Sequence, residues 1–441
     1  MLFERLQVKI SSRPMTAVAK RFFPPAIAYG GSLNVQPNSH GDLQWRLGAR
    51  EQFVEPVKLE GKWAFVIFDR CVGTNDAQTF IDALAKYSVQ HGVHISHKYV
   101  DICEASSEVE SDIDSMMKQM GQENTKFVMF TTRMKFDPVH NVMKRLEAQY
   151  GVITQHVSQQ TLMKAIGQKG AFLVLGNLCL KLNLKLGGVN HNLRVCESFL
   201  SANSNLRNFD SKLFPKTRMF VGFDISHAGP QSFADRQMKK PQSEPTVVGM
   251  AFTIGEVTKI RGSYWMQEPR EATISDIADN FAAALLTFYK ETNSLPSDII
   301  VFRCGCSEGE FKKAAKEMID MQKAFVDVNH LYSHGMYSPS LTCLVVQTNS
   351  NYRIVPTKID SQARAMEQNV PCGTVVEDAL HPAYIEFLIV PQKALQGTAR
   401  ALRCTLVTHS QGTSGQLLSV DELEQVTNIL CYGHQVRSYY E

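Results

Sequence analysis

The chain has 441 residues, of which 44% are hydrophobic, 20% charged and 9% aromatic. These proportions are typical of a soluble globular protein and exclude a disordered or fibrous one, and the length exceeds what one hydrophobic core usually organises. Because 46 Lys and Arg stand against 43 Asp and Glu, giving a formal net charge of +3, any contact with nucleic acid must come from a local basic patch.

Residues 1–59 are rich in turn formers, as in FFPPAIAYGG, and show no sustained hydrophobic period. We expect an extended linker that wraps a neighbouring domain. The chain has no apolar run of 18 residues and no charged-then-apolar leader, and its ten cysteines are scattered through apolar surroundings. These features predict a soluble protein of a reducing, intracellular compartment.

Residues 60–209 alternate apolar strand-like runs (KWAFVIFDR, TKFVMFTTR, GVITQHVS) with helical stretches. This alternation predicts an α/β domain with a parallel sheet. A second α/β domain, residues 210–441, begins with RMFVGFDIS and continues through a helix around Ile274 to Lys290 and the strand IIVFRC. We place the domain boundary near residue 210, after a polar connector.

A basic region lies in the first domain. Between Gly151 and Cys196 there is no acidic residue, although the stretch contains five cationic ones: Lys164, Lys169, Lys181, Lys185 and Arg194. An acid-free stretch of this kind predicts an anion-binding patch.

Two predicted helices place cationic groups on one face. In DPVHNVMKRLEAQYG, Asp137 is an expected N-cap, Pro138 takes the first helical position, and Gly151 follows the end. His140 and Lys144 are four residues apart on this helix and therefore share a face. The helix GNLCLKLNLKLGG repeats the spacing with Lys181 and Lys185.

Gln155 lies at the expected end of the strand between these helices. Ammonium groups, an amide donor and converging helix ends together predict a phosphate site, because they replace the hydration shell of the anion. The alternative is that each lysine is a solvated surface residue whose stem covers apolar side chains.

In the second domain, RMFVGFDIS brings Asp224 to the carboxyl end of a strand, where ligands of α/β sheets usually bind. A nuclease that uses two Mg²⁺ ions needs several carboxylates around them. At the end of the neighbouring strand IIVFRC the residue is Cys304, whose thiol is a poor Mg²⁺ ligand. A lone Asp at a strand end is also a common turn former, so these residues alone predict no catalysis.

Taken in order, the motifs NLCLKLNLKLGGVN, MFVGFDISH, FRCGCSEGEF, PCGTVV, HPAYIEFLIV and LQGTAR resemble the second half of a eukaryotic Argonaute. The resemblance covers nearly the whole chain. It implies a linker over residues 1–59, a Rossmann-like MID domain over 60–209 and an RNase H-like PIWI domain over 210–441.

The resemblance implies that the MID domain holds the 5′ phosphate of a guide RNA. The positions that match the family's phosphate-binding set are His140, Lys144, Gln155, Lys181 and Lys185. Histidine replaces the family's usual tyrosine at position 140. In this respect the sequence resembles the nematode secondary-siRNA Argonautes. An imidazole can stack on the first base and, if protonated, adds positive charge, so we expect the site to tolerate a more highly charged 5′ end such as a triphosphate. Met134 to Asp137 matches the segment that inspects that base.

The slicing form of the PIWI domain uses Asp, Glu, Asp and His around two Mg²⁺. Asp224 matches the first Asp, Glu271 lies within one residue of the Glu position, and Cys304 replaces the second Asp. The sequence stops at Glu441, before the segment that would bring the final His, so we expect a C-terminally truncated chain without slicing activity. Three arginines match residues that contact the RNA backbone in the family: Arg353, Arg400 and Arg437.

These expectations give a leading function and two alternatives. The chain is expected to bind a small guide RNA, pair it with target RNA and recruit silencing proteins without cutting. It would need no cofactor, with Mg²⁺ at the 5′ phosphate as an option, and would act in the cytoplasm and also in the nucleus. The alternatives are an active Mg²⁺-dependent endoribonuclease, in which Glu271, Glu308 or a distant carboxylate substitutes for the lost ligand, and a PIWI-like protein scaffold without RNA.

Overall fold

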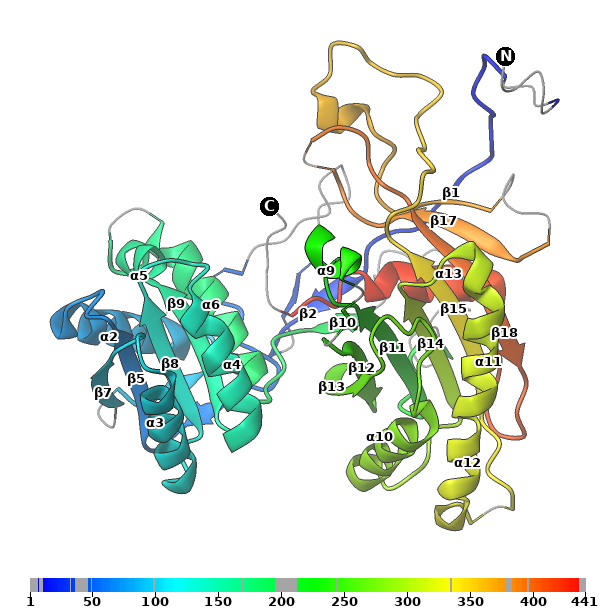
Figure 1. Ribbon diagram of the computed structural model, residues 1–441. Helices are drawn as coiled ribbons and strands as arrows, with labels where there is room; N and C mark the ends of the chain where they lie inside the picture. The colour runs from blue at the N-terminus through cyan, green and yellow to red at the C-terminus, as the bar shows by residue number, and fades with distance from the viewer. Residues whose placement is uncertain are drawn as a thin grey trace. The chain divides into compact units, whose positions relative to one another are not determined.

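The protein forms two compact units, which we call the first and the second unit (Figure 1). The first unit is built mainly from Gln44–Arg194 and the second mainly from Val195–Tyr432. None of the described helices is both long and apolar enough to cross a membrane. The computed structural model describes residues 7, 11–31, 33–35, 47–48, 50–97, 100–167, 170–194, 212–238, 240–242, 244–333, 335–377, 383–394 and 396–435.

The described part of residues 1–59 forms short strands that belong to both units. Strand β1 (Lys20–Arg21) pairs with β16 (Thr374–Val376) of the second unit. Strands β2 (Ala26–Ala28) and β3 (Asn34–Val35) form a small sheet with β10 (Asn192–Arg194) of the first unit. Strand β4 (Lys58–Leu59) pairs with β6 (His94–Ile95).

The first unit contains the predicted parallel sheet. Its strand order is β7-β5-β8-β9, and all three pairings are parallel. Every residue of β5 and β8 is buried, because helices cover both faces of the sheet. The strands are β5 (Trp63–Phe68), β7 (Val100–Ala105), β8 (Phe127–Thr132) and β9 (Ile153–Ser158).

In the first unit, helices pack on both faces of the sheet, and alternate strand residues point to opposite faces. Helices α3 (Glu110–Gln122) and α4 (Pro138–Tyr150) pack with Val66 and Phe130 in one apolar cluster. On the other face Phe65 contacts Phe80 of α2 (Thr74–Val89), with ring centroids 6.0 Å apart. Helices α5 (Gln159–Ile166) and α6 (Ala171–Lys185) pack against α2. The first unit is therefore a three-layer α/β domain, as predicted.

Helix α4 begins and ends as its sequence predicts. The Asp137 side chain accepts a hydrogen bond of 3.1 Å from the Val139 N–H, Pro138 takes the first helical position, and Gly151 ends the helix with φ of 67°. This start lies just after β8, so the first turns of α4 stand at the carboxyl end of the parallel sheet. That edge is where ligands of such sheets bind.

The second unit has a nine-stranded mixed sheet of order β1-β16-β17-β18-β15-β14-β11-β12-β13. β14 pairs in parallel with both β11 and β15, and the other pairs are antiparallel. Together with the first unit it bears out the predicted α/β class. Its remaining strands are β11 (Arg218–Ser226), β12 (Thr246–Ile254), β13 (Glu256–Gln267), β14 (Asp298–Cys304), β15 (Ser340–Gln347), β17 (Glu386–Val390) and β18 (Leu402–Ser410).

Helix α10 (Ile277–Thr292) packs with α12 (Lys323–Asp327) in the main apolar core of the second unit, and α11 (Phe311–Met321) packs on β15 and β18 (Figure 1). The expected start of α10 at Ile274 is wrong. Asp276 has φ of 52°, and the Ile274 N–H donates to Glu317 Oε1 at 2.8 Å. The other helices are α9 (Phe233–Gln237), α13 (Val420–Leu430) and 3-10 turns at Glu308–Glu310, Asn329–Leu331 and Ala365–Gln368.

Lys20 attaches β1 to the second unit through three carboxylates. Its Nζ lies 2.6 Å from Glu377 Oε1 and 3.4 Å from Glu424 Oε2, and it also pairs with Asp421. The Glu424 side chain is fully buried, and its Oε1 has no hydrogen-bond partner among the described residues. Burial and the neighbouring Glu377 raise the pKa of Glu424 to about 8, against the opposing effect of Lys20.

This pKa predicts a loss of stability with rising pH. Because the folded state keeps the Glu424 proton up to about pH 8 while the unfolded chain loses it near pH 4.5, ionisation destabilises the fold across that window. Glu424→Gln should therefore be more stable than the wild type at pH 8.5, by roughly 1–3 kcal/mol, and similar to it at pH 5. Urea unfolding at both pH values measures this.

Exposed Glu268→Gln in the same unit is the matched control and should follow the wild type at both pH values. A Glu424→Gln variant that follows the wild type at pH 8.5 would contradict the assignment of this proton.

Candidate functional site

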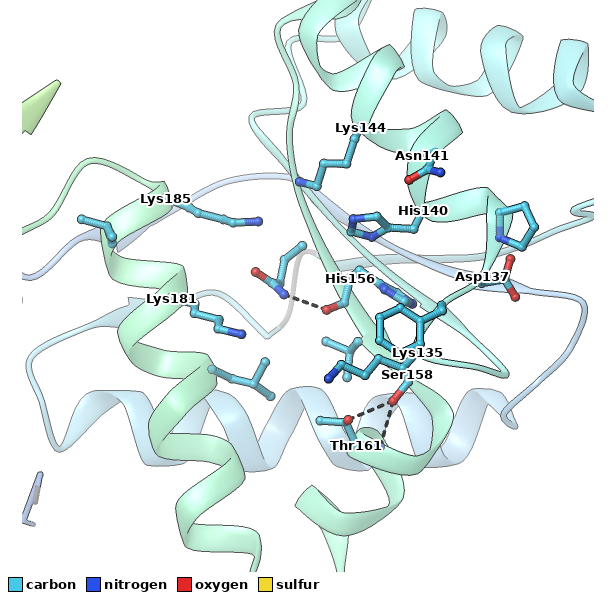
Figure 2. Close-up of a pocket in the computed structure, with 16 residues that line it drawn as sticks. Lys135, Asp137, His140, Asn141, Lys144, His156, Ser158, Thr161, Lys181 and Lys185 are labelled. Carbon is cyan, nitrogen blue, oxygen red and sulfur yellow. Dashed lines mark hydrogen bonds between the residues drawn. The ribbon is translucent and has the colours of Figure 1, made fainter. Parts of the chain in front are cut away.

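A cavity of about 820 Å³ opens at the carboxyl end of the sheet in the first unit (Figure 2). Its walls come from the segment after β8, the first half of α4, strand β9 and the second half of α6. All five residues expected to hold a guide phosphate line it: His140, Lys144, Gln155, Lys181 and Lys185. The structure thus brings together residues that are up to 45 positions apart.

Four lysines line this cavity. Lys144 comes from α4 and Lys181 and Lys185 from α6, while Lys135 lies in the segment between β8 and α4. The sequence analysis did not single out Lys135, although it lies inside the segment expected to inspect the first base. Lys164 and Arg194 of the basic region are exposed and do not line the cavity, and Lys169 lies outside the described residues.

Two of these ammonium groups share one backbone oxygen. Lys185 Nζ donates to the Thr154 carbonyl at 2.7 Å, and Lys144 Nζ donates to the same oxygen at 3.1 Å. Figure 2 shows the two side chains reaching toward one another from α6 and α4. Such like charges repel in a half-buried site, and burial followed by the Lys144 charge lowers the pKa of Lys185 to about 8.

Lys144 also has an acidic partner that the sequence analysis missed. Its Nζ pairs with Glu147 one turn along α4 and donates to Thr154 Oγ1 at 2.9 Å. The Thr154 hydroxyl donates in turn to Glu147 Oε2 at 2.5 Å. Burial raises the pKa of Glu147, but the hydrogen bonds from Lys144 and Thr154 outweigh it and lower the pKa overall. The carboxylate is therefore ionised at neutral pH.

Gln155 lies in the middle of β9, so its expected place at the strand end is wrong. Its Nε2 donates to the His156 carbonyl at 2.7 Å, which leaves one amide N–H. Its Oε1 is buried and has no hydrogen-bond partner among the described residues. The amide can therefore meet both a donor and an acceptor of a bound molecule.

Stacked rings form one wall of the cavity. His156 stacks on Phe130 with centroids 4.9 Å apart and an interplanar angle of 11°, and His140 lies 5.2 Å from His156 at 49°. Burial and then His140 lower the pKa of His156 to about 4. Burial, followed by Lys144 and Lys185, also lowers the pKa of His140. Both imidazoles are thus neutral at pH 7.

Burial and two nearby ammonium groups disfavour the protonation of His140, which was the condition for its expected contribution to a 5′ triphosphate site. In the ligand-free cavity the positive charge comes from lysines, and His140 provides a ring with a buried Nδ1 that has no partner among the described residues. The segment Met134 to Asp137 does lie at the cavity, which Lys135, Phe136 and Asp137 help to line.

In the second unit, Asp224 and Cys304 lie at the carboxyl ends of adjacent parallel strands. Phe223 of β11 pairs with Arg303 of β14. The next residues, Asp224 and Cys304, therefore lie side by side on neighbouring strands. Gly305, with φ of 71°, turns the chain beside them, and a Cβ added to it would lie 3.4 Å from Asp224 Oδ1. Burial and then Asp224 raise the pKa of Cys304, which keeps its thiol neutral.

The residues around Asp224 do not fit a pair of Mg²⁺ ions. Within the described residues, one group of three possible ligands has its atoms within 4.8 Å of one another, and it is the Lys20-bound set Glu377, Asp421 and Glu424. Asp224, Glu271 and Cys304 do not form such a group. Glu308 pairs with Arg403, and Arg403 also donates two bonds of 2.8 Å to buried Glu386.

A buried ion pair that the sequence analysis missed supports this edge of the second unit. Arg303 donates to both oxygens of Glu317 at 2.8 and 3.0 Å and to the Ala272 carbonyl at 3.1 Å. Both side chains are at most 2% exposed. The pair therefore fixes the end of β14 and the loop that follows Glu271.

Two of the three arginines expected at the RNA backbone are described, and both are exposed. Arg353 donates to the Ser350 carbonyl at 2.8 Å, and Arg400 Nη1 lies 3.5 Å from Asn349 Oδ1. Ser350 Oγ donates to the Ala401 carbonyl, so these arginines lie on neighbouring loops. Arg437 lies outside the described residues.

Known proteins resemble this chain along its whole length. The Nuclear RNAi defective-3 protein of Caenorhabditis elegans is 26% identical over 97% of this chain and 39% of its own length. The Argonaute protein wago-1 of the same nematode is 24% identical over 99% of this chain and 43% of its own. The chain thus spans less than half the length of these relatives.

The fold has a counterpart in a solved structure, Kluyveromyces polysporus Argonaute with a guide RNA. It matches 97% of this chain and 51% of its own, with a TM-score of 0.76 and 18% identity. The family model of the Piwi domain matches residues 126–440. The chain therefore belongs to the Piwi-domain family, and along nearly its whole length it is similar to the MID-PIWI region of eukaryotic Argonautes.

Proposed function

We propose that the chain binds a small guide RNA by its 5′ phosphate in the cavity of the first unit and mediates RNA-guided silencing without cutting the target. The observation that carries the proposal is the pair of ammonium groups on the Thr154 carbonyl. The carboxylate beside them, Glu147, balances only one of these two charges, and a phosphate would add up to two negative charges and several acceptor oxygens.

The neighbouring imidazoles of His140 and His156 supply the second part of the proposal. Neutral His140 and the exposed Phe136 offer faces for the first base, beside the lysines that would take its phosphate. The names of the relatives, which include a nuclear RNAi protein, and the guide RNA in the yeast structure point the same way. Target RNA, bound by pairing to the guide, and silencing proteins would be the other partners. Cytoplasmic action, extending to the nucleus, is part of the same proposal.

The second unit supports the proposal of silencing without cutting. Asp224 lies beside a neutral thiol instead of a second carboxylate, and Glu308 is engaged by Arg403. Fewer negative groups bind the two cations too weakly for hydrolysis. The four lysines that line the cavity argue against a scaffold without RNA, because a protein that only contacts other proteins has no need for several cations around one cavity. Because the lysines supply positive charge, the chain would bind a guide without a metal ion. A Mg²⁺ ion bound to the 5′ phosphate is an optional addition.

Phosphate recognition can be tested with short RNAs that differ in their 5′ ends. The chain should bind 5′-monophosphate and 5′-triphosphate RNA more tightly than 5′-hydroxyl RNA of the same sequence. Lys185→Met should weaken binding of the phosphorylated RNAs about 10- to 100-fold, because a charge-assisted bond is lost, and leave 5′-hydroxyl RNA nearly unaffected. Fluorescence anisotropy measures all six affinities. Equal affinity of the wild type for the three ends would refute the phosphate site.

The pKa of Lys185 predicts how this binding depends on pH. A bound phosphate raises that pKa, so binding is linked to protonation of free Lys185, whose pKa is about 8. Between pH 7 and pH 9 the affinity for 5′-monophosphate RNA should fall by up to about tenfold, while the phosphate itself stays a dianion. Lys185→Arg keeps its charge and should flatten the profile. A wild-type profile already flat over this range would contradict the shifted pKa.

The absence of cutting predicts the outcome of a cleavage assay. The guide-loaded chain should leave a fully paired target intact in Mg²⁺ or Mn²⁺. Cys304→Asp should strengthen Mn²⁺ binding, because a second carboxylate joins Asp224, yet should not restore cutting while no third carboxylate joins the pair. Cys304→Ser, which adds no charge, is the control for metal binding. Target cleavage by the wild type would favour the endonuclease alternative.

A further inference from the structure

Lys144 has no N–H left for a ligand in this structure. An ammonium has three N–H donors. One pairs with Glu147, one bonds Thr154 Oγ1 at 2.9 Å, and one bonds the Thr154 carbonyl at 3.1 Å. Lys185, by contrast, has one acceptor among the described residues, the Thr154 carbonyl at 2.7 Å. The two lysines therefore differ in their readiness to bind an anion.

Glu147 and Thr154 hold the Lys144 ammonium in a closed set of contacts. The Thr154 hydroxyl donates its proton to Glu147 Oε2 at 2.5 Å, so the same carboxylate oxygen accepts from both residues. Thr154 is fully buried, and the Glu147 side chain is 26% exposed. Lys144 lines the cavity whereas Glu147 does not, so the carboxylate holds the ammonium from outside the space that a ligand would fill.

From these contacts we infer that Glu147 is an internal counter-anion of the phosphate site. In the ligand-free chain it occupies Lys144, and an incoming 5′ phosphate must take Lys144 away from it. Glu147 thereby sets a minimum charge for the ligand, because a dianion competes with a carboxylate whereas a hydroxyl group does not. The inference rests on the proposed function and concerns the selectivity of the same site.

The opposite role is a positioning one, in which Glu147 holds Lys144 ready for the ligand. The two roles predict opposite signs. Removal of an internal competitor strengthens phosphate binding and destabilises the ligand-free chain, where Lys144 and Lys185 lose their nearest negative charge. Removal of a positioning group weakens binding.

The test measures binding of 5′-monophosphate RNA and 5′-hydroxyl RNA to the full chain. Glu147→Gln should raise the affinity for the monophosphate RNA by about tenfold, since a charge-assisted contact no longer has to be broken, and should leave the hydroxyl RNA within about twofold. The ligand-free variant should melt at a lower temperature than the wild type. Glu110→Gln is the matched control. It removes a carboxylate of α3 that pairs with Arg145, a residue of the same helix as Glu147, and it should change neither affinity.

Two further variants separate donor release from a general change in charge. Thr154→Val leaves the net charge unchanged but removes one acceptor of Lys144 and one donor to Glu147, so it should also strengthen phosphate binding. In a Lys144→Met background, Glu147→Gln should give no gain, because the competitor acts through Lys144. Thr154→Val also serves as the test if Glu147→Gln does not fold.

The inference is overturned if Glu147→Gln weakens or leaves unchanged the binding of monophosphate RNA, or if its gain persists without Lys144. A wild-type chain that binds both RNAs equally would instead refute the proposed function. The two failures are therefore distinct.

Discussion

The Thr154 carbonyl determines the chemistry of the first unit, because it holds two ammonium groups that would otherwise separate. Strand β9 presents this oxygen between α4 and α6, and each helix contributes one lysine to it. Repulsion and burial lower the pKa of Lys185 and, together with Lys144, keep His140 neutral. Burial is the largest cause of the lowered pKa values of Lys185 and His140, and the lysine pair held by this backbone oxygen adds to it.

The second unit depends on a different electrostatic solution. Arg303 and Glu317 form a fully hydrogen-bonded buried pair that fixes the end of β14, where a metal-dependent nuclease would place a carboxylate. This pair anchors the strand and the loop after Glu271. The half-buried Cys304 beside it is a neutral thiol and therefore needs no counter-charge.

Much of the fold and part of the site could be predicted from sequence because they depend on local patterns. The caps of α4 and the four-residue spacings placed His140 with Lys144 and Lys181 with Lys185 correctly. Thr154, Glu147 and His156 were missed, because their importance arises from contacts between β8, β9 and α4. The pairing of Glu308 with Arg403 joins residues 95 positions apart and leaves no local signal.

His140 is neutral because it is partly buried beside two lysines. The charged groups of the cavity and its aromatic rings therefore have different roles. A third cation, at position 140, would have to form beside Lys144 and Lys185, and both burial and charge repulsion oppose it. The rings are instead stacked and uncharged, and they offer a surface to a base whatever its charge. Charge therefore resides on long amine chains that can follow a phosphate, while the stacked rings keep a fixed position. A terminal nucleotide carries both matching groups: a phosphate that lysines can contact and a flat base that can lie against a ring.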